Sequence, residues 1–298
     1  MSRAGDARVR GRAVLLALSL IWLAGMLWSA HADITGTGDP VGALIQMAGA
    51  LPVVVAASML AGAAAGLAAL GWLAPRGWPR WVVGPLAGAL VGAVGGGLIL
   101  VGYGTRSSIV VLAVSVLIAG ALGGALALVP PTELVAAGVC ATLAAFVVAF
   151  VLRIFESQLV HLFGAGSSPA SQLAAASRLA LTTSLLGGGA AGLVAFGYLR
   201  RSGGRRPFPV YLAAGAFPGV LLLLAEAVTL VGGHQVFRAV GRLSAADQAV
   251  RDYVGNSRLN HALILLFVGG LVALLCLGRT LRPAEPADRA RTRRAKVS

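Results

Sequence analysis

One acidic residue stands alone in a long apolar stretch of this sequence. Glu226 lies in the run LLLLAEAVTL, with hydrophobic neighbours on both sides. A carboxylate in hydrocarbon is costly unless it is protonated, paired or hydrated. Glu226 is therefore either a site that binds a proton, a cation or a lipid headgroup, or half of a structural pair with an arginine at an outer helix end, for which Arg153 and Arg178 are candidates. A third possibility is a glutamate at the wetted interface.

Two further polar features carry less weight. Arg153 and Glu156 stand three residues apart, so on a helix they share a face and are expected to pair at the outer interface. Such a pair is more often scaffolding than chemistry. Gln46 is a second candidate for a buried polar side chain, in the N-terminal part of the chain.

The residues that usually form catalytic or metal sites show no useful spacing here. The four histidines are not arranged as HxH, HxxxH or HExxH, and the two cysteines fall inside apolar stretches. The sequence also contains no P-loop, no Gly-x-Ser-x-Gly and no paired intramembrane carboxylates. The sequence therefore predicts no metal, no cofactor and no catalytic set.

The elements that must position Glu226 are membrane helices. The 298 residues are 58% hydrophobic and only 11% charged, and the mean hydropathy is +0.87. Several apolar runs exceed the roughly 18 to 20 residues that cross a bilayer core. Because these runs do not alternate, a β-barrel is excluded. We expect an all-α, polytopic membrane protein.

The net charge of +14 is distributed as a topology signal. Most lysines and arginines lie in short segments beside apolar runs, at residues 3–12, 76–80, 200–206 and 279–296. This pattern predicts that both termini are cytoplasmic and that the basic segments contact anionic lipid headgroups. Nucleic-acid binding is not favoured, because the cations follow the spans rather than form one surface.

Eight spans are expected, at residues 13–30, 41–73, 81–101, 108–129, 132–152, 179–199, 209–231 and 261–277. The first is expected to be a retained helix, although Ala30-His31-Ala32 resembles a signal-peptidase site. The second is too long for one straight crossing, so it tilts or bends near Pro52. Outer segments are expected at 153–177 and 232–260, the latter with a surface helix. A basic cytoplasmic N-terminus (1–12) and a basic disordered tail (279–298) complete the chain.

The chain also contains an internal repeat. AAGLAALGWL at Ala64–Leu73 matches AAGLVAFGYL at Ala190–Leu199, and AGALVG at Ala87–Gly92 matches AGAFPG at Ala214–Gly219. We interpret this as a tandem duplication of a four-helix unit, residues 13–129 and 132–278. Because four crossings are an even number, the two repeats are parallel. Ile99 aligns with Glu226, so the acid belongs to one repeat only.

A glycine recurs every fourth residue in the third span. This spacing forms one groove along a helix, where a neighbouring backbone can approach closely. Tight packing inside one bundle is the favoured interpretation, and a pore lining or an oligomer seam is the alternative. The helix-packing glycines are Gly84, Gly88, Gly92 and Gly96, with Gly215 and Gly219 in the second repeat.

These features leave three functions for a bacterial, multi-pass protein of the cell membrane. The first is a non-enzymatic subunit or scaffold of an envelope assembly, suggested by the long outer segments. The second is a small-solute, ion or lipid permease or channel that uses Glu226. The third, a lipid-modifying envelope enzyme, is least favoured because no catalytic set is present. Partner membrane proteins are expected for the first function and a homo-oligomer for the second.

Overall fold

The computed structural model describes the backbone of residues 3–35, 40–73, 77–105, 107–166, 168–203, 206–240 and 245–280. Side chains are described for 9–32, 51–73, 77–105, 109–166, 168, 170–203, 206–232 and 255–280. All regular secondary structure within these ranges is helical. The side chain of Gln46 and the tail from residue 281 lie outside them.

The helices run in chain order from α1 to α9. Their bounds are α1 Arg3–Thr35, α2 Pro40–Leu73, α3 Arg80–Tyr103, α4 Ser107–Leu126, α5 Thr132–Ile154, α6 Glu156–Leu162, α7 Pro169–Arg201, α8 Phe208–Val240 and α9 Ala245–Thr280. Eight of these described helices are long and apolar enough to cross a membrane, which agrees with the predicted number. Only the short α6 falls outside this group.

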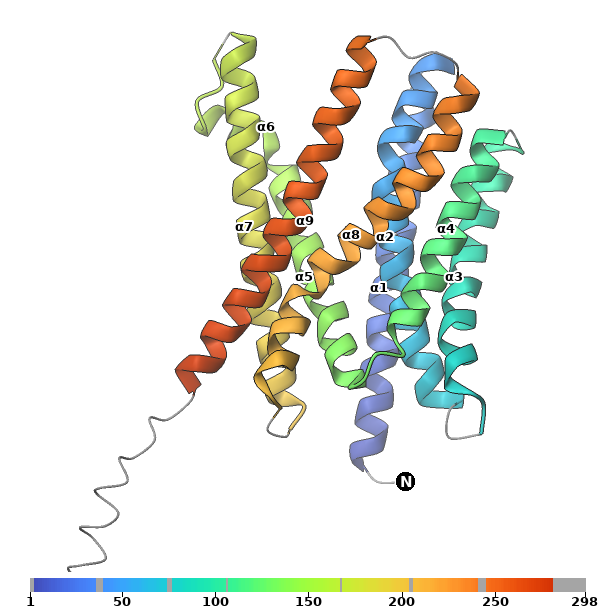
Figure 1. The fold of residues 1–298 in the computed structure, drawn as a ribbon, viewed down its shortest axis with the longest axis vertical. Helices are drawn as coiled ribbons and strands as arrows, with labels where there is room; N and C mark the ends of the chain where they lie inside the picture. The colour runs from blue at the N-terminus through green and yellow to red at the C-terminus, as the bar shows by residue number, and fades with distance from the viewer. Residues whose placement is uncertain are drawn as a thin grey trace, which may run out of the picture.

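The long helices stand roughly side by side as a bundle (Figure 1). The start of α1 and the end of α9 lie at the same end of that bundle, the lower end in Figure 1. We call this the tail end and the opposite one the far end. α8 crosses the bundle obliquely, so that it packs against α2 and α4 as well as α5, α7 and α9.

The helices are longer than the sequence predicted on the far side. Residues 169–177, predicted as part of an outer segment, form the first turns of α7. Residues 232–240 continue α8, and residues 245–260 are the first half of α9, so no separate surface helix stands between them. The helices extend because the polar residues here still have adequate helix propensity and no proline interrupts them.

α2 is the central helix of the first half. It continues through Pro52 as one helix, and nearly all of Leu51–Leu73 is buried. α1, α3, α4, α5 and α8 all pack on it. The segment is rich in alanine and glycine, and small side chains let neighbouring helices approach from every side.

Glycines of α2 and α3 meet glycines of α4 in the first half. A Cβ atom at Gly66 would lie 2.8 Å from the carbonyl oxygen of Gly124, and a Cβ atom at Gly88 would lie 2.8 Å from the Cα of Gly124. A Cβ atom at Gly62 or Gly88 would also collide with the backbone of Gly120. Such spacing leaves room for a hydrogen atom only. The other glycines of the α3 series also face α4, namely Gly84, Gly92 and Gly96.

The second half contains the same kind of contact. Gly192 of α7 and Gly215 of α8 both lie against the backbone of Gly269 in α9. Gly219 lies against the backbone of Leu266, one turn earlier in α9. In each half, therefore, the last helix fits between two others at positions where a side chain would not fit.

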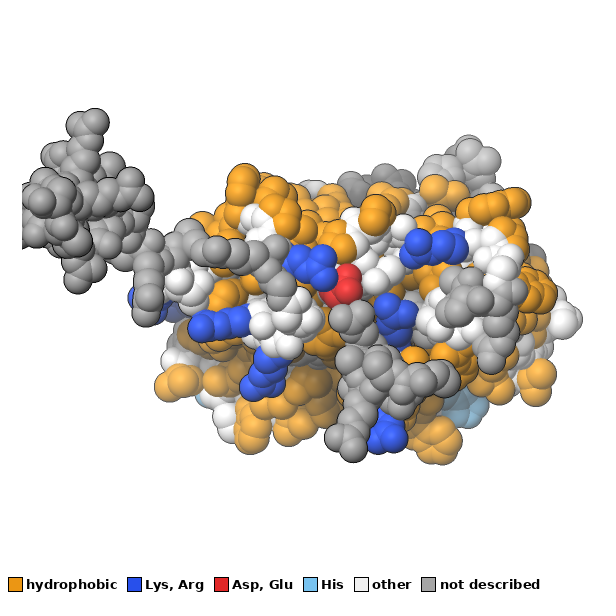
Figure 2. All heavy atoms as spheres, turned by 90° about the horizontal axis from the view of Figure 1, so that it is seen from below, with side chains coloured by type: hydrophobic (Ala, Val, Ile, Leu, Met, Phe, Trp, Pro, Cys, Tyr) orange, Lys and Arg blue, Asp and Glu red, His pale blue; other side chains and the backbone are white. Residues whose placement is uncertain are grey.

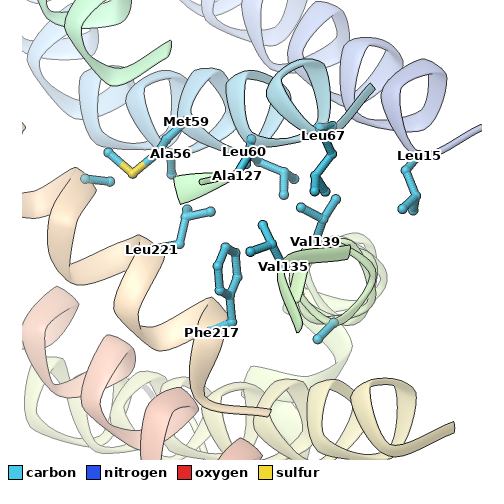
Figure 3. Packing of buried hydrophobic residues seen from close by; sticks show 14 of the residues in the cluster. Leu15, Ala56, Met59, Leu60, Leu67, Ala127, Val135, Val139, Phe217 and Leu221 are labelled. Carbon is cyan, nitrogen blue, oxygen red and sulfur yellow. The ribbon is translucent and has the colours of Figure 1, made fainter. Parts of the chain in front are cut away.

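The two halves meet through an apolar core (Figure 3). Met59 and Leu60 of α2 face Leu221 of α8, while Val135 of α5 and Phe217 of α8 lie beside them. All five side chains are buried. α2, α5 and α8 thus form the junction between the halves.

We predict that Gly88→Ala destabilises the fold whereas Gly97→Ala does not. Both glycines lie on α3, but a Cβ atom at Gly88 would collide with α4, and at Gly97 nothing lies within 4 Å. Overpacking costs about 1 to 3 kcal/mol, whereas Gly97→Ala gains helix propensity of about 0.5 to 1 kcal/mol. Thermal unfolding in detergent measures both. Equal melting temperatures would show that α3 and α4 are not in close contact.

Candidate functional site

Glu226 is buried on the C-terminal part of α8. Its exposed fraction is 8%. It lies within a candidate membrane span, Phe208–Gly232. The nearby Thr229 hydroxyl donates to the carbonyl of Ala225 at 2.8 Å, so that hydroxyl satisfies itself on its own helix.

Arg258 of α9 lies level with Glu226 and within the range of a charge–charge interaction. Within the described residues, no lysine, arginine or histidine lies within 4.0 Å of the carboxylate, so the interaction is longer than a direct ion pair. The geometry follows from helix packing. α8 and α9 run in opposite directions and touch at Gly219 and Leu266. Moving two turns along α8 to Glu226 therefore corresponds to moving back along α9 to the turn of Arg258.

The arginines that the sequence nominated as partners lie elsewhere. Arg178 donates from Nη1 to the carbonyl of Phe163 at 3.0 Å, which fastens the segment after α6 onto α7. Arg153 is exposed in the last turn of α5. It forms no ion pair within 4.0 Å with Glu156, and the two residues belong to different helices, because α5 ends at Ile154 and α6 begins at Glu156.

A histidine on α9 and a serine on α7 lie about one turn from the level of Arg258. His261 follows Arg258 by three residues and therefore shares its face of α9. Its Nδ1 lies 2.6 Å from the Ser184 hydroxyl on α7, and the donor depends on the tautomer. Ser184 is buried. Three helices thus contribute polar side chains to this half: α7, α8 and α9. We call Ser184, Glu226, Arg258 and His261 the polar group.

Sequence analysis did not bring Arg258 and His261 to Glu226, because it placed Arg258 in an outer segment and began the eighth span only at His261. In the structure α9 starts at Ala245, so both residues lie on a continuous helix. The signal that could have found them is helical spacing. Arg258, Ala262 and Leu265 fall on one stripe, and the last two are buried.

The corresponding places in the first half are apolar. Ile99 stands seven residues after Gly92, as Glu226 stands after Gly219. Arg258 and His261 stand 11 and 8 residues before Gly269 of α9. The residues 11 and 8 positions before Gly120 of α4 are Ile109 and Leu112, and both are buried like Ile99.

One polar position is common to both halves. Ser58 precedes Gly62 by four residues, as Ser184 precedes Gly188. Ser58 donates to the carbonyl of Val116 on α4 at 2.9 Å, whereas Ser184 is bonded to the His261 ring. The serine thus fastens α2 to α4 in one half, and α7 to α9 in the other.

Comparison of the chain with protein-family models, curated proteins and solved structures finds no match in any of the three. Inferences about function therefore rest on the polar group itself. A carboxylate, a guanidinium and an imidazole inside a membrane bundle can bind and release a proton or hold a small charged solute.

We predict that Glu226 is energetically coupled to Arg258 and not to Arg178. Glu226→Gln combined with Arg258→Gln should show a coupling free energy of about 0.5 to 3 kcal/mol, because the two charges interact. The matched cycle with Arg178→Gln should be additive within about 0.5 kcal/mol. Unfolding of the purified protein gives both values. Coupling to Arg178 as large as to Arg258 would contradict the arrangement.

Proposed function

We propose that the protein is a membrane permease in which Glu226 binds and releases a proton or cation during transport of a small solute. The observation that carries this proposal is a buried carboxylate inside a span, without a direct ion pair among the described residues and with Arg258 and His261 on the next helix. Ionisable residues in spans are expensive, and they commonly mark ion or substrate pathways.

A parallel duplication supports the same proposal. α1 with α2, α2 with α4, and α3 with α4 pack in the first half as α5 with α7, α7 with α9, and α8 with α9 pack in the second. We propose that the two four-helix units derive from one ancestor and have the same orientation. Parallel repeats are one of the arrangements found in secondary transporters, which bind substrate near the middle of the membrane.

The competing function is a non-enzymatic subunit of an envelope assembly. Its support in the sequence was the pair of long outer segments, available for docking, and the lack of any polar pathway along most spans. Much of both segments continues the membrane helices α7, α8 and α9 in the structure, so the first of these supports is weaker. A lipid-modifying enzyme still lacks a catalytic set. These observations favour transport over the other two functions.

The proposed sidedness places both termini, and thus the tail end, in the cytoplasm of a bacterial cell. We predict that reporter fusions after Arg80 and after Arg206 report cytoplasm, and that fusions after Asp39, Gly166 and Ala246 report the exterior. The charges beside the spans are the physical reason. A cytoplasmic signal at Gly166 would rule out both the eight-span topology and the parallel repeat.

The first half supplies a design for testing the role of the polar group. We predict that the triple variant Glu226→Ile, Arg258→Ile, His261→Leu folds, since the first half carries these apolar residues at the corresponding places. Glu226 is buried and Arg258 and His261 are half-buried, and replacing buried charges by apolar residues is often neutral or stabilising. In proteoliposomes on a solid-supported membrane, a pH step should produce a charge movement in the wild type that is lost in this variant and in Glu226→Gln.

Ser58→Ala is the matched control, because it removes a buried polar group from the first half only. It should keep the charge movement. An unchanged signal in Glu226→Gln would overturn the proposal. Affinity purification in mild detergent tests the competing function, since stable protein partners in the absence of any charge movement would favour a subunit.

A further inference from the structure

Basic side chains surround an acidic one at the tail end of the bundle (Figure 2). This face contains the starts of α1, α5 and α8 and the ends of α7 and α9. It is therefore where the first half and the second half meet on the side of the chain termini, well separated along α8 from Glu226.

Arg12 of α1 contacts both halves. Its Nη1 donates to the carbonyl of Leu67 in α2 at 3.5 Å, and its Nη2 donates to the Thr132 hydroxyl of α5 at 3.3 Å. Both hydrogen bonds are long, so they use little of the binding capacity of the guanidinium, which has five N–H donors.

Arg206 approaches the same place from the segment before α8. Its Nη2 lies 3.5 Å from Oε1 of Glu133, and both side chains are partly exposed. Its Nε is shielded from solvent and has no hydrogen-bond partner. Thr132, which accepts from Arg12, and Glu133, which pairs with Arg206, are consecutive residues at the start of α5. The two contacts therefore belong to one cluster, which we call the arginine seam: Arg12, Thr132, Glu133 and Arg206.

The arginine seam has unused capacity for an anion. It holds two guanidinium groups and one carboxylate, so a positive charge remains in excess. The Nε donor of Arg206 is unmet. The helix α5 also starts here without a side-chain cap, and the unpaired N–H groups of a first turn add to the positive potential. Phosphate oxygens fit such a donor set, because one guanidinium group can donate two parallel N–H···O hydrogen bonds to a phosphate.

The surroundings place this cluster at the depth of lipid headgroups. Trp72 at the end of α2 and Trp78 and Trp81 at the start of α3 are 48%, 54% and 75% exposed at the same end of the bundle. Exposed tryptophans are typical of the boundary between hydrocarbon and headgroups. A phosphate at this depth is more readily supplied by a lipid than by the solution.

We propose that the arginine seam binds the phosphate of one anionic phospholipid between the two halves. The headgroup would accept hydrogen bonds from Arg12 of the first half and from Arg206 of the second. A lipid bound there joins the halves at the tail end, in addition to the apolar core between α2, α5 and α8. This proposal does not depend on transport through the polar group.

Full-length protein, delipidated in detergent, tests the site. After phosphatidylglycerol is added back, native mass spectrometry should show one tightly bound molecule of it, and the melting temperature should rise with phosphatidylglycerol and not with phosphatidylcholine. In Arg12→Gln and in Arg206→Gln the affinity should fall roughly fivefold each, as expected for one cation near an anionic headgroup. Arg201→Gln is the matched control, since Arg201 is exposed at the same end, and it should bind like the wild type.

Further arms separate the alternatives. Inorganic phosphate that stabilises the wild type as well as phosphatidylglycerol does would show a site for free anions and overturn the lipid. If phosphatidylglycerol raised the melting temperature of the wild type and of Arg206→Gln equally, the proposed site would be wrong. Should Arg12→Gln fail to fold, Arg206→Lys is decisive, because it keeps the charge but loses the planar fork. We expect Arg206→Lys to bind phosphatidylglycerol more weakly than Arg201→Gln does.

Discussion

Close backbone contact at a few glycines is the interaction on which the bundle depends. In a membrane, burial of apolar side chains drives helix association little, because lipid is equally apolar, so van der Waals contact and interhelical hydrogen bonds must supply the energy. Gly120 and Gly124 of α4 and Gly269 of α9 provide it by letting two neighbouring helices approach each of them. Buried serine hydroxyls beside these contacts, on Ser58 and Ser184, add hydrogen bonds between helices.

The same contacts determine where the charges lie. Because α8 touches α9 at Gly215 and Gly219, the two helices keep a defined register, and Glu226 is level with the turn of Arg258. Without a fixed register, a carboxylate on one long helix and a guanidinium on another would not meet reproducibly. The glycines, which have no polar side chain of their own, are therefore part of the basis of the polar group.

The sequence was most informative where composition and spacing act locally. Apolar run length predicted the number of spans, and the four-residue glycine period pointed to close helix contact. Arg258 could not be predicted as the neighbour of Glu226, because that depends on where α9 begins and on which helix lies against α8. Arg153 and Arg178 had seemed plausible because they are near helix ends, yet Arg153 is exposed at the end of α5 and Arg178 donates to the Phe163 carbonyl. The arginine seam was missed for the same reason, since Arg12 and Thr132 meet only through tertiary packing.

The central position of α2 has a consequence for the order of membrane insertion. Met59 and Leu60 lie against Leu221, which the ribosome adds about 160 residues later. At roughly 5 to 20 residues per second, this face of α2 waits on the order of 10 to 30 s for its partner. During that time it is surrounded by lipid or by the insertion machinery. Leu51–Leu73 contains no charged residue, so the helix that waits is one that lipid can solvate, and the buried acid enters the membrane only with α8.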